Sequence, residues 1–172
     1  TFSTQTGKAY YCNSIPGFIK DSSASIVGQL VKHAFEINKE QSDAWDKQIH
    51  DLQTRLEACG MEGDIIFEYD IPRLGKRVDV VLLLEGIIFC IEFKVGESKI
   101  LEADVDQVLD YALDLKNFHK FSQDNLVVPI LVATNYRSSS TEIKMSVYDD
   151  RVVNPLVTGA SGLANLISEV LK

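Results

Sequence analysis

The chain has 172 residues, with 17 basic and 25 acidic side chains and a formal net charge of −8. Its length favours one domain with a core of its own, and 45% hydrophobic and 24% charged residues are typical of a globular protein. The acidic balance argues against strong, autonomous, non-specific DNA binding, because such binding depends on basic side chains that neutralise phosphates.

The cysteines, the absence of long apolar runs and the first residue bear on where the protein works. Cys12, Cys59 and Cys90 are odd in number and lack metal-type spacing, which is typical of reduced thiols in an intracellular protein. No apolar run approaches the ~18 residues that span a bilayer, and no targeting segment opens the chain. We therefore expect a cytoplasmic protein without a membrane partner. The chain begins with Thr1 rather than Met, which is typical of a processed or trimmed protein, and we expect a fragment of a longer chain.

Two helices are expected in the first third of the chain. Residues 1–21 have mixed polarity, and Pro16–Gly17 predicts a turn. Ser22 or Ser23 is a suitable N-cap for a helix that continues to about residue 34. A second helix has apolar residues at helical spacing from Trp45 onwards. We expect Ser42 to cap this helix and the chain to leave it near Gly60.

Three strands, a helix and a buried strand are expected next. Residues 64–71, 77–84 and 87–95 are rich in Val, Ile and Phe and are joined by short connections, which predicts a meander. An amphipathic helix follows over residues 101–113. The continuous apolar run 126–133 is typical of a central strand. This order predicts an α/β fold with a mixed central sheet flanked by helices, in a single domain over residues 1–172.

The last segment offers less regular signals. Residues 143–157 are expected to hold another strand or two, and residues 163–171 a final helix that Ser161 or Gly162 opens. Gly159 and Gly162 could in principle hold an anion at this helix start, but a simple turn is the favoured interpretation. Gly7-Lys8 lacks the upstream glycine of a Walker A loop, so no nucleotide site is expected there.

The second and third strands of the meander carry an unusual set of charges. If residues 85–86 form a two-residue turn, residues that face each other across the hairpin have numbers that sum to 171. Asp79 then lies opposite Glu92, with Cβ atoms ~5 Å apart on one face of the sheet. Lys94 shares this face, because side chains along a strand alternate with a period of two.

Two facing carboxylates repel each other, so a neutralising group is expected beside them. Lys94 can supply part of the charge, and a divalent cation with oxygen ligands can supply the rest. A bound cation polarises a phosphoryl oxygen and acidifies water, while a lysine stabilises developing charge. This chemistry suits hydrolysis of a phosphodiester. The alternative is a structural salt-bridge cluster, which the apolar surroundings disfavour because an unpaired charge is costly there.

A family resemblance rests on these residues. Residues 77–81 (Arg-Val-Asp-Val-Val) and 91–95 (Ile-Glu-Phe-Lys-Val), joined by a hairpin, resemble the PD-(D/E)XK, or restriction-endonuclease-like, superfamily of nucleases, with Val78 in place of the usual proline. The resemblance covers about residues 42–135 and implies a restriction-endonuclease-like core and a nuclease activity. DNA is favoured over RNA as the substrate.

The same resemblance implies a role for individual residues. Asp79 and Glu92 would be ligands of Mg²⁺ or Mn²⁺, helped by the carbonyl oxygen of Phe93. Lys94 would be the catalytic lysine. RecB-like members of the superfamily carry a Gln-x-x-x-Tyr motif on the next helix, and Gln107 and Tyr111 match it. Because residues four apart share a helix face, both would point toward the site, although a polar helix flank is an equal alternative for this pair alone.

A looser resemblance concerns the chain as a whole. Residues 68–73, Phe118–His119 and Ser122 look like bacterial proteins that join such a nuclease to a superfamily-1-type helicase, some of them in phage defence. It implies that an ATP-driven motor in the same chain supplies much of the grip on nucleic acid. His119 is an accessory candidate, but as a lone histidine near a helix end it is expected to be structural.

Two questions stay open at this stage. A further acidic metal ligand is expected from the superfamily, and Glu36, Asp43, Asp46, Glu68 and Asp70 are candidates, the last because a turn at residues 74–75 would place it opposite Asp79. The alternatives to a nuclease are a catalytically inactive module that docks nucleic acid or protein, and an acidic domain that restrains an attached motor. The facing carboxylates and the lysine argue against the docking module, because docking has no need of them, and the restraining domain stays open.

Overall fold

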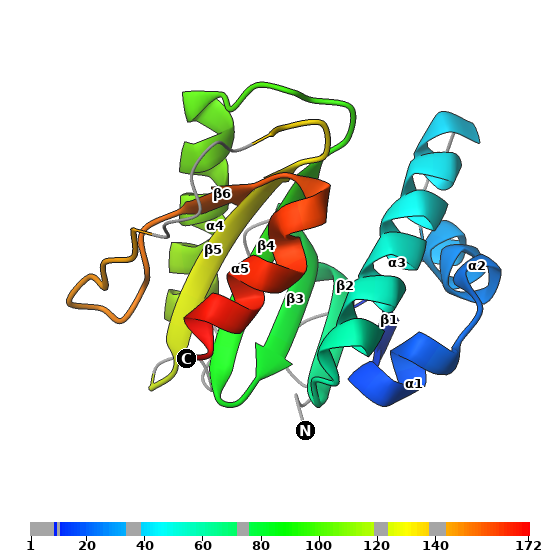
Figure 1. Ribbon diagram of the computed structural model, residues 1–172, viewed down its shortest axis with the longest axis horizontal. Helices are drawn as coiled ribbons and strands as arrows, with labels where there is room; N and C mark the ends of the chain where they lie inside the picture. The colour runs from blue at the N-terminus through cyan, green and yellow to red at the C-terminus, as the bar shows by residue number, and fades with distance from the viewer. Residues whose placement is uncertain (1–8, 10, 34–38, 72–75, 119–123, 138–143) are drawn as a thin grey trace.

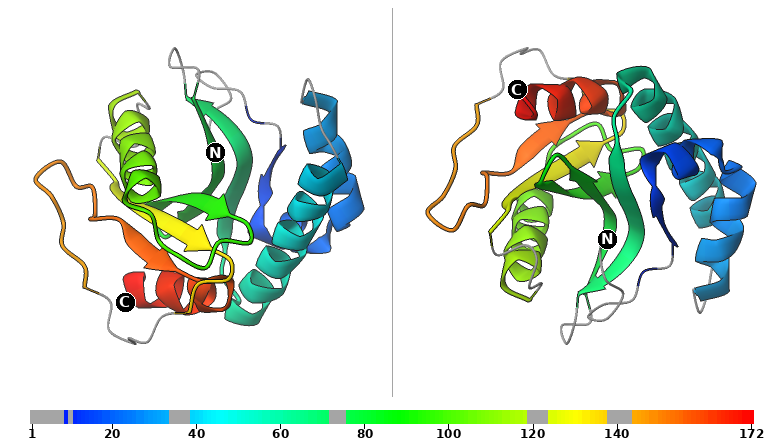
Figure 2. Two further views of the ribbon diagram at one scale, coloured as in Figure 1. Left: turned by 90° about the horizontal axis from the view of Figure 1, so that it is seen from above. Right: turned by 90° about the horizontal axis from the view of Figure 1, so that it is seen from below.

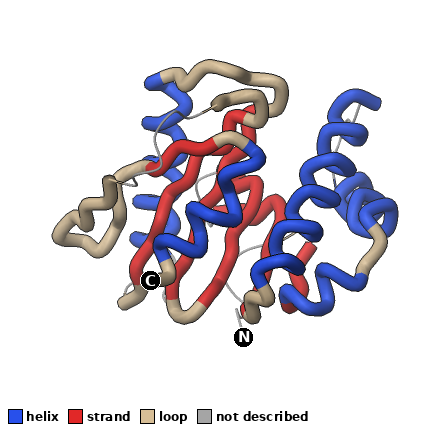
Figure 3. The backbone as a smooth tube through the Cα atoms, in the orientation of Figure 1, coloured by secondary structure: helices blue, strands red, loops and turns tan. Residues whose placement is uncertain are grey.

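The computed structural model describes residue 9 and residues 11–33, 39–71, 76–118, 124–137 and 144–172. The described strands form one six-stranded sheet in the spatial order β1-β2-β3-β4-β5-β6. β1 to β4 are antiparallel neighbours, whereas β4 pairs with β5, and β5 with β6, in parallel. The predicted α/β fold with a mixed sheet flanked by helices is confirmed (Figures 1 and 3).

The strands agree closely with the sequence patterns. Their bounds are β1 (Tyr11–Ser14), β2 (Gly63–Ile71), β3 (Lys76–Leu84), β4 (Ile87–Lys94), β5 (Leu126–Ala133) and β6 (Leu156–Thr158). The predicted meander and the buried strand match β2 to β5 within one residue at each end. Glu85 and Gly86, which join β3 to β4, have φ values of 50° and 77°. Positive φ at both central residues is the condition for the tight turn that suits two twisted strands.

In the described residues, five α-helices lie on the two faces of this sheet, with bounds α1 (Ile15–Lys20), α2 (Ser23–His33), α3 (Lys39–Cys59), α4 (Glu102–Phe118) and α5 (Leu163–Val170). Viewed from above, α4 lies on one side of the sheet, and α3 and α5 lie on the other (Figure 2). The hydrophobic core is divided accordingly. One cluster joins α1, α2, α3 and α5 to the sheet, and a smaller one joins α4 to the opposite face.

Side chains of β3 and β4 contribute to both clusters in alternation. Leu82 and Phe89 pack in the larger cluster, while Val81 and Cys90 pack against α4. Both faces of these strands are therefore buried, which explains why their sequences are continuously apolar rather than alternating. A charge placed within them is costly unless an opposite charge, hydrogen bonds or a metal ion compensates for its burial.

The N-terminal third corrects three expectations. Pro16–Gly17 is not a turn but lies in the first turn of α1, where Ser14 accepts the Gly17 N–H at 3.1 Å and proline needs no donor. β1 before it was not predicted. Ser42 does not cap α3, because this helix is already formed at Lys39. The Ser22 cap is supported, since its hydroxyl accepts the Ser25 N–H at 3.1 Å.

The C-terminal region combines short pieces. Of the predicted segment 143–157, residues 144–157 are described, and they hold the start of β6 and isolated bridges that link Val147 to Val153 and Val127 to Val152. A 3₁₀ turn, Ala160–Gly162, leads into α5, as the turn interpretation of these glycines predicted. The three cysteines are free thiols. In the part of the chain that the structure describes, no helix has the length and apolar character to cross a bilayer.

Candidate active site

The site lies at the open end of the β3–β4 hairpin. The predicted register is confirmed from Leu84–Ile87 to Val80–Ile91, where the ladder of paired residues ends. Asp79 and Glu92 come next, and there the strands are joined by hydrogen bonds from backbone N–H groups to side-chain carboxyl groups. Glu92 Oε1 accepts the Asp79 N–H at 2.9 Å, and Asp79 Oδ2 accepts the Phe93 N–H at 3.0 Å. Each carboxyl group therefore holds the opposite strand.

The alternation of side chains breaks at Asp79. Val78 packs in the cluster beside α4, whereas Val80, two residues later, packs in the cluster on the other face. In a regular strand these two side chains would share a face. The neighbouring strand is irregular at the same level, because Glu68 has a φ of 50° in the interior of β2. Such backbone is uncommon for a residue other than glycine and is concentrated at functional sites.

The register of β2 corrects the prediction for Asp70. Asp70 pairs with Arg77 rather than lying opposite Asp79, because the pairing of β2 with β3 is offset by two residues from the expected one. The residues of the connection, 72–75, lie outside the described ones. Phe67–Val80 and Tyr69–Val78 are paired, so Glu68 occupies the position across from Asp79.

Burial and mutual repulsion dominate the electrostatics of the two carboxyl groups. Burial raises the pKa of Asp79, and the Phe93 N–H opposes this shift in part. Burial raises the pKa of Glu92 to about 9, and the charge of Asp79 adds to the effect. Glu92 is only 5% exposed. The hydrogen bond between the two side chains raises the pKa of Glu92 and lowers that of Asp79, which favours Glu92 as the group that holds the shared proton. A cation at this point would replace that proton.

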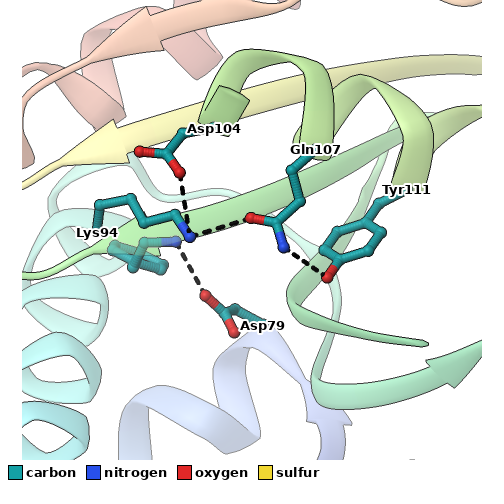
Figure 4. Close-up of polar contacts among 6 residues, drawn as sticks. Asp79, Lys94, Asp104, Gln107 and Tyr111 are labelled. Atoms are coloured by element: carbon teal, nitrogen blue, oxygen red, sulfur yellow. Dashed lines mark hydrogen bonds and ion pairs between the residues drawn. The ribbon is translucent and has the colours of Figure 1, made fainter. Parts of the chain in front are cut away.

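Lys94 lies on the same face as Glu92 and reaches toward α4. Its Nζ donates to Gln107 Oε1 at 3.0 Å and lies 3.5 Å from Asp104 Oδ1. Gln107 Nε2 in turn donates to the Tyr111 hydroxyl at 3.0 Å. Figure 4 shows this chain of contacts above Asp79. The expectation that Gln107 and Tyr111 point toward the site therefore agrees with the geometry, and their chemical roles stay predictions.

The end of β4 is fastened to the end of β5. Gly96, with a φ of 81°, turns the chain after the strand, and its N–H donates to Thr134 Oγ1 at 2.7 Å. Asn135 Nδ2 donates to the Gly96 carbonyl oxygen at 3.1 Å, and the Thr134 N–H donates to the Lys94 carbonyl oxygen at 3.2 Å. The backbone at Lys94 and Gly96 is thus fastened to the end of β5, which favours a preorganised site.

The donor set suits a hard cation. In the described ranges, no group of three or more His, Cys, Asp and Glu side chains is arranged to hold one metal ion. Two carboxyl groups and a nearby backbone carbonyl are what the protein offers, each carboxyl using one oxygen for a backbone N–H. Mg²⁺ commonly binds through one or two carboxylates together with water and substrate phosphate. The residues present therefore fit Mg²⁺ or Mn²⁺.

Among the described candidates for a further acidic ligand, none joins Asp79 and Glu92 in a group of three possible metal ligands. Asp43 and Asp46 are exposed on α3, and Glu36 lies outside the described residues. His119 and Ser122 also lie outside them, so the accessory role considered for His119 is not addressed. Asp104 is the residue that the sequence predictions missed. It precedes Gln107 by three positions and Tyr111 by seven, a spacing that places all three on one face of α4.

A small pocket lies behind the site, on the other face of β4. It has a volume of about 30 Å³, and Phe93 and Val95 line it together with side chains of α3 that include Lys47 and Arg55. Arg55 also donates to the Ser161 carbonyl oxygen at 3.1 Å. Lys47 and Arg55, together with the acidic Asp51, therefore lie near the end of β4 on the side away from α4.

Similarity of this chain to known proteins is found among solved structures. No protein-family model and no curated protein matches the chain. Among solved structures it is similar to the crystal structure of protein VC1899 from Vibrio cholerae, with 12% sequence identity and a TM-score of 0.37. The match covers 86% of this chain and 41% of that chain, so this chain spans less than half of the other.

Proposed function

We propose that this chain is a metal-dependent nuclease that hydrolyses phosphodiester bonds, with DNA favoured over RNA. One observation carries the proposal. Two carboxyl groups, Asp79 and Glu92, face each other at the end of a buried hairpin, and a lysine follows on the same face. Two such carboxylates destabilise the fold unless a proton or a cation neutralises part of their charge, and carboxyl groups with perturbed pKa values beside a lysine favour a catalytic site.

Asp79, Glu92 and the carbonyl oxygen of Phe93 would hold the metal ion, Mg²⁺ or Mn²⁺. When bound, the ion supplies a Lewis acid for the phosphoryl oxygen and lowers the pKa of water. The protein contributes orientation. Backbone N–H groups fix one oxygen of each carboxyl group, so the remaining oxygens are held in place without loss of further side-chain freedom on binding.

Lys94 would act on the substrate. An ammonium group has three donors, and Gln107 and Asp104 engage two directions of this one. The remaining direction is available for a phosphate oxygen or the attacking water, where it would stabilise developing negative charge. Gln107 keeps the ammonium in place, and Tyr111 holds the Gln107 amide. The resemblance to RecB-like nucleases likewise implies that Gln107 and Tyr111 belong to the site.

The acidic charge of this chain suggests that a partner helps it to bind nucleic acid. The net charge is −8, and α4 carries Asp104, Asp106 and Asp110 near the site. Nucleic acid would be repelled by this helix, so strong binding needs a further source of positive charge. We propose a helicase-type motor in the same chain as that source, acting in the cytoplasm, and defence against phage as the setting.

Cleavage assays test the proposal. The 172-residue chain is incubated with single-stranded DNA, double-stranded DNA and RNA in Mg²⁺, Mn²⁺ or chelator. Asp79→Ala and Lys94→Ala are compared with Glu85→Ala, an exposed residue at the opposite end of the hairpin. We expect metal-dependent cleavage that each site variant lowers by at least ~10³-fold and the control leaves unchanged.

Two outcomes contradict the proposal. Cleavage that survives Asp79→Ala or Lys94→Ala would show that the chemistry lies elsewhere. A wild type that neither cleaves nor binds Mn²⁺ would point instead to an inactive docking or regulatory module. Calorimetric binding of Mn²⁺ that Asp79→Ala abolishes, without cleavage, would support the metal site and assign the missing activity to the absent motor.

A further inference from the structure

Asp104 competes with the metal-binding carboxyl groups for the charge of Lys94. Lys94 Nζ lies 3.5 Å from Asp104 Oδ1 and donates to Gln107 Oε1 at 3.0 Å, and both partners belong to α4. The side chains of Lys94 and Asp104 are only 29% and 20% exposed. A pair that is largely shielded from water is screened less than a surface pair and holds its geometry better.

Asp79 and Glu92 are the carboxyl groups of the proposed metal site, and Lys94 is close enough to interact with both. The positive charge of Lys94 lowers the pKa of each carboxyl group, so the ionised carboxylates attract the ammonium. Yet among the described residues no ion pair joins Lys94 to Asp79 or Glu92, and the ion pair it makes is the one with Asp104. The ammonium is therefore turned toward α4 (Figure 4).

A lysine that turned the other way would interfere with metal binding. Its ammonium would become the counter-ion of Asp79 and Glu92 and would occupy the oxygens that a divalent cation needs. The cation would then have to displace a bound charge, and its affinity would fall by the free energy of that contact. A second acceptor on the opposite side removes this competition.

We propose that Asp104 is a positioning residue that holds the Lys94 ammonium against α4 and so keeps it from occupying the metal site formed by Asp79 and Glu92. The inference rests on the proposed function, because it assigns those two side chains to a metal ion. It adds that the lysine of the site has its own carboxylate partner.

The architecture of α4 suits this role. Asp104 lies in the first turn, where its N–H donates to the Leu101 carbonyl oxygen at 3.1 Å. Val108 and Ala112, farther along the helix, are fully buried against the sheet. The carboxylate is thus presented from a helix that the core anchors, three residues before Gln107. Both acceptors reach Lys94 from fixed positions, which lowers the entropy cost of holding a long side chain.

A double-mutant cycle on metal binding tests the proposal. Mn²⁺ is titrated into the wild type, Asp104→Asn, Lys94→Ala and the double variant, and Asp106→Asn is the matched control because it removes the same charge from an exposed site on α4. We expect Asp104→Asn to raise the Kd for Mn²⁺ about tenfold when Lys94 is present and about twofold or less in the Lys94→Ala background. Asp106→Asn should resemble the weaker case.

Equal effects of Asp104→Asn in both backgrounds would overturn the proposal, because they would show a general loss of negative charge. If the wild type bound no Mn²⁺, the metal site itself would be contradicted. A second measurement tests the positioning of Lys94 without any metal. In metal-free protein labelled with ¹⁵N-lysine, the Lys94 Nζ resonance, assigned by its loss in Lys94→Ala, should shift in Asp104→Asn and not in Asp106→Asn. An unchanged Lys94 resonance in Asp104→Asn would contradict the positioning role by itself.

Discussion

The two ends of the β3–β4 hairpin are built from the same strands by different rules. At the turn end, Leu82 pairs with Phe89 in a regular ladder, and both are fully buried. At the open end the ladder stops after Val80–Ile91, and Asp79 and Glu92 bond to the opposite backbone through their side chains. One end gains stability from burial, while the other accepts buried carboxyl groups.

Within this one hairpin, the turn end contributes stability and the open end carries the residues of the proposed site. Apolar side chains on both faces fix the hairpin in place, so the open end can carry groups that oppose folding. The regular end acts as the scaffold for the irregular one. Substitutions at the two ends should therefore change the free energy of unfolding in opposite directions.

The largest effect on stability is expected at the turn end. Phe89→Ala removes a fully buried ring from the larger core cluster and should lower the free energy of unfolding by about 4 kcal/mol. Urea denaturation followed by circular dichroism measures the change. A loss of less than about 1 kcal/mol would contradict the description of this end as the scaffold.

At the open end, the metal-free protein should lose stability as the pH rises. The pKa of Glu92 is raised from its ordinary value of 4.5 to about 9 in the folded protein, so between these limits the folded state binds more protons than the unfolded state. The free energy of unfolding then falls with increasing pH and levels off above the folded pKa. Between about pH 5 and about pH 9 we expect the free energy of unfolding to fall throughout, with a slope of at most about 1.4 kcal/mol per pH unit for the one proton held by this pair.

Glu92→Gln is the matched variant for this prediction. Its amide oxygen can still accept the Asp79 N–H, and its amide nitrogen can donate where the shared proton lies. The variant should be more stable than the wild type at about pH 9 and should lack most of the pH dependence in chelator. An identical pH profile for the two proteins would show that Glu92 does not carry the buried proton.

The sequence predicted much of the hairpin and less of its surroundings. Strand bounds and register followed from the Glu85–Gly86 turn and the apolar runs, because a two-residue turn leaves one register available. The pairing of Asp70 was wrong because the longer connection after β2 does not fix its register in this way. Asp104 was missed because it is one of several acidic residues on the same helix, and nothing in the sequence shows which of them contacts Lys94.

The smallest effect is expected one contact away from the carboxyl groups. Tyr111→Phe removes the hydroxyl that accepts from Gln107 but keeps the ring, and should lower the rate of cleavage about 3- to 10-fold. Gln107→Ala, which removes the Lys94 contact itself, should lower it more. Single-turnover rates on DNA with Mn²⁺ measure both. A larger effect for Tyr111→Phe than for Gln107→Ala would contradict this order of contacts.

Binding of Mn²⁺ to the open end of the hairpin tests the central claim most directly. Calorimetric titration compares the wild type with Asp79→Asn, which keeps an oxygen to accept the Phe93 N–H but removes the charge. We predict saturable binding to the wild type, accompanied by release of a proton from the Asp79–Glu92 pair, and a loss of at least ~10-fold in affinity in Asp79→Asn. Equal affinity in the two proteins, or no binding to the wild type, would contradict the claim that these carboxyl groups form a metal site.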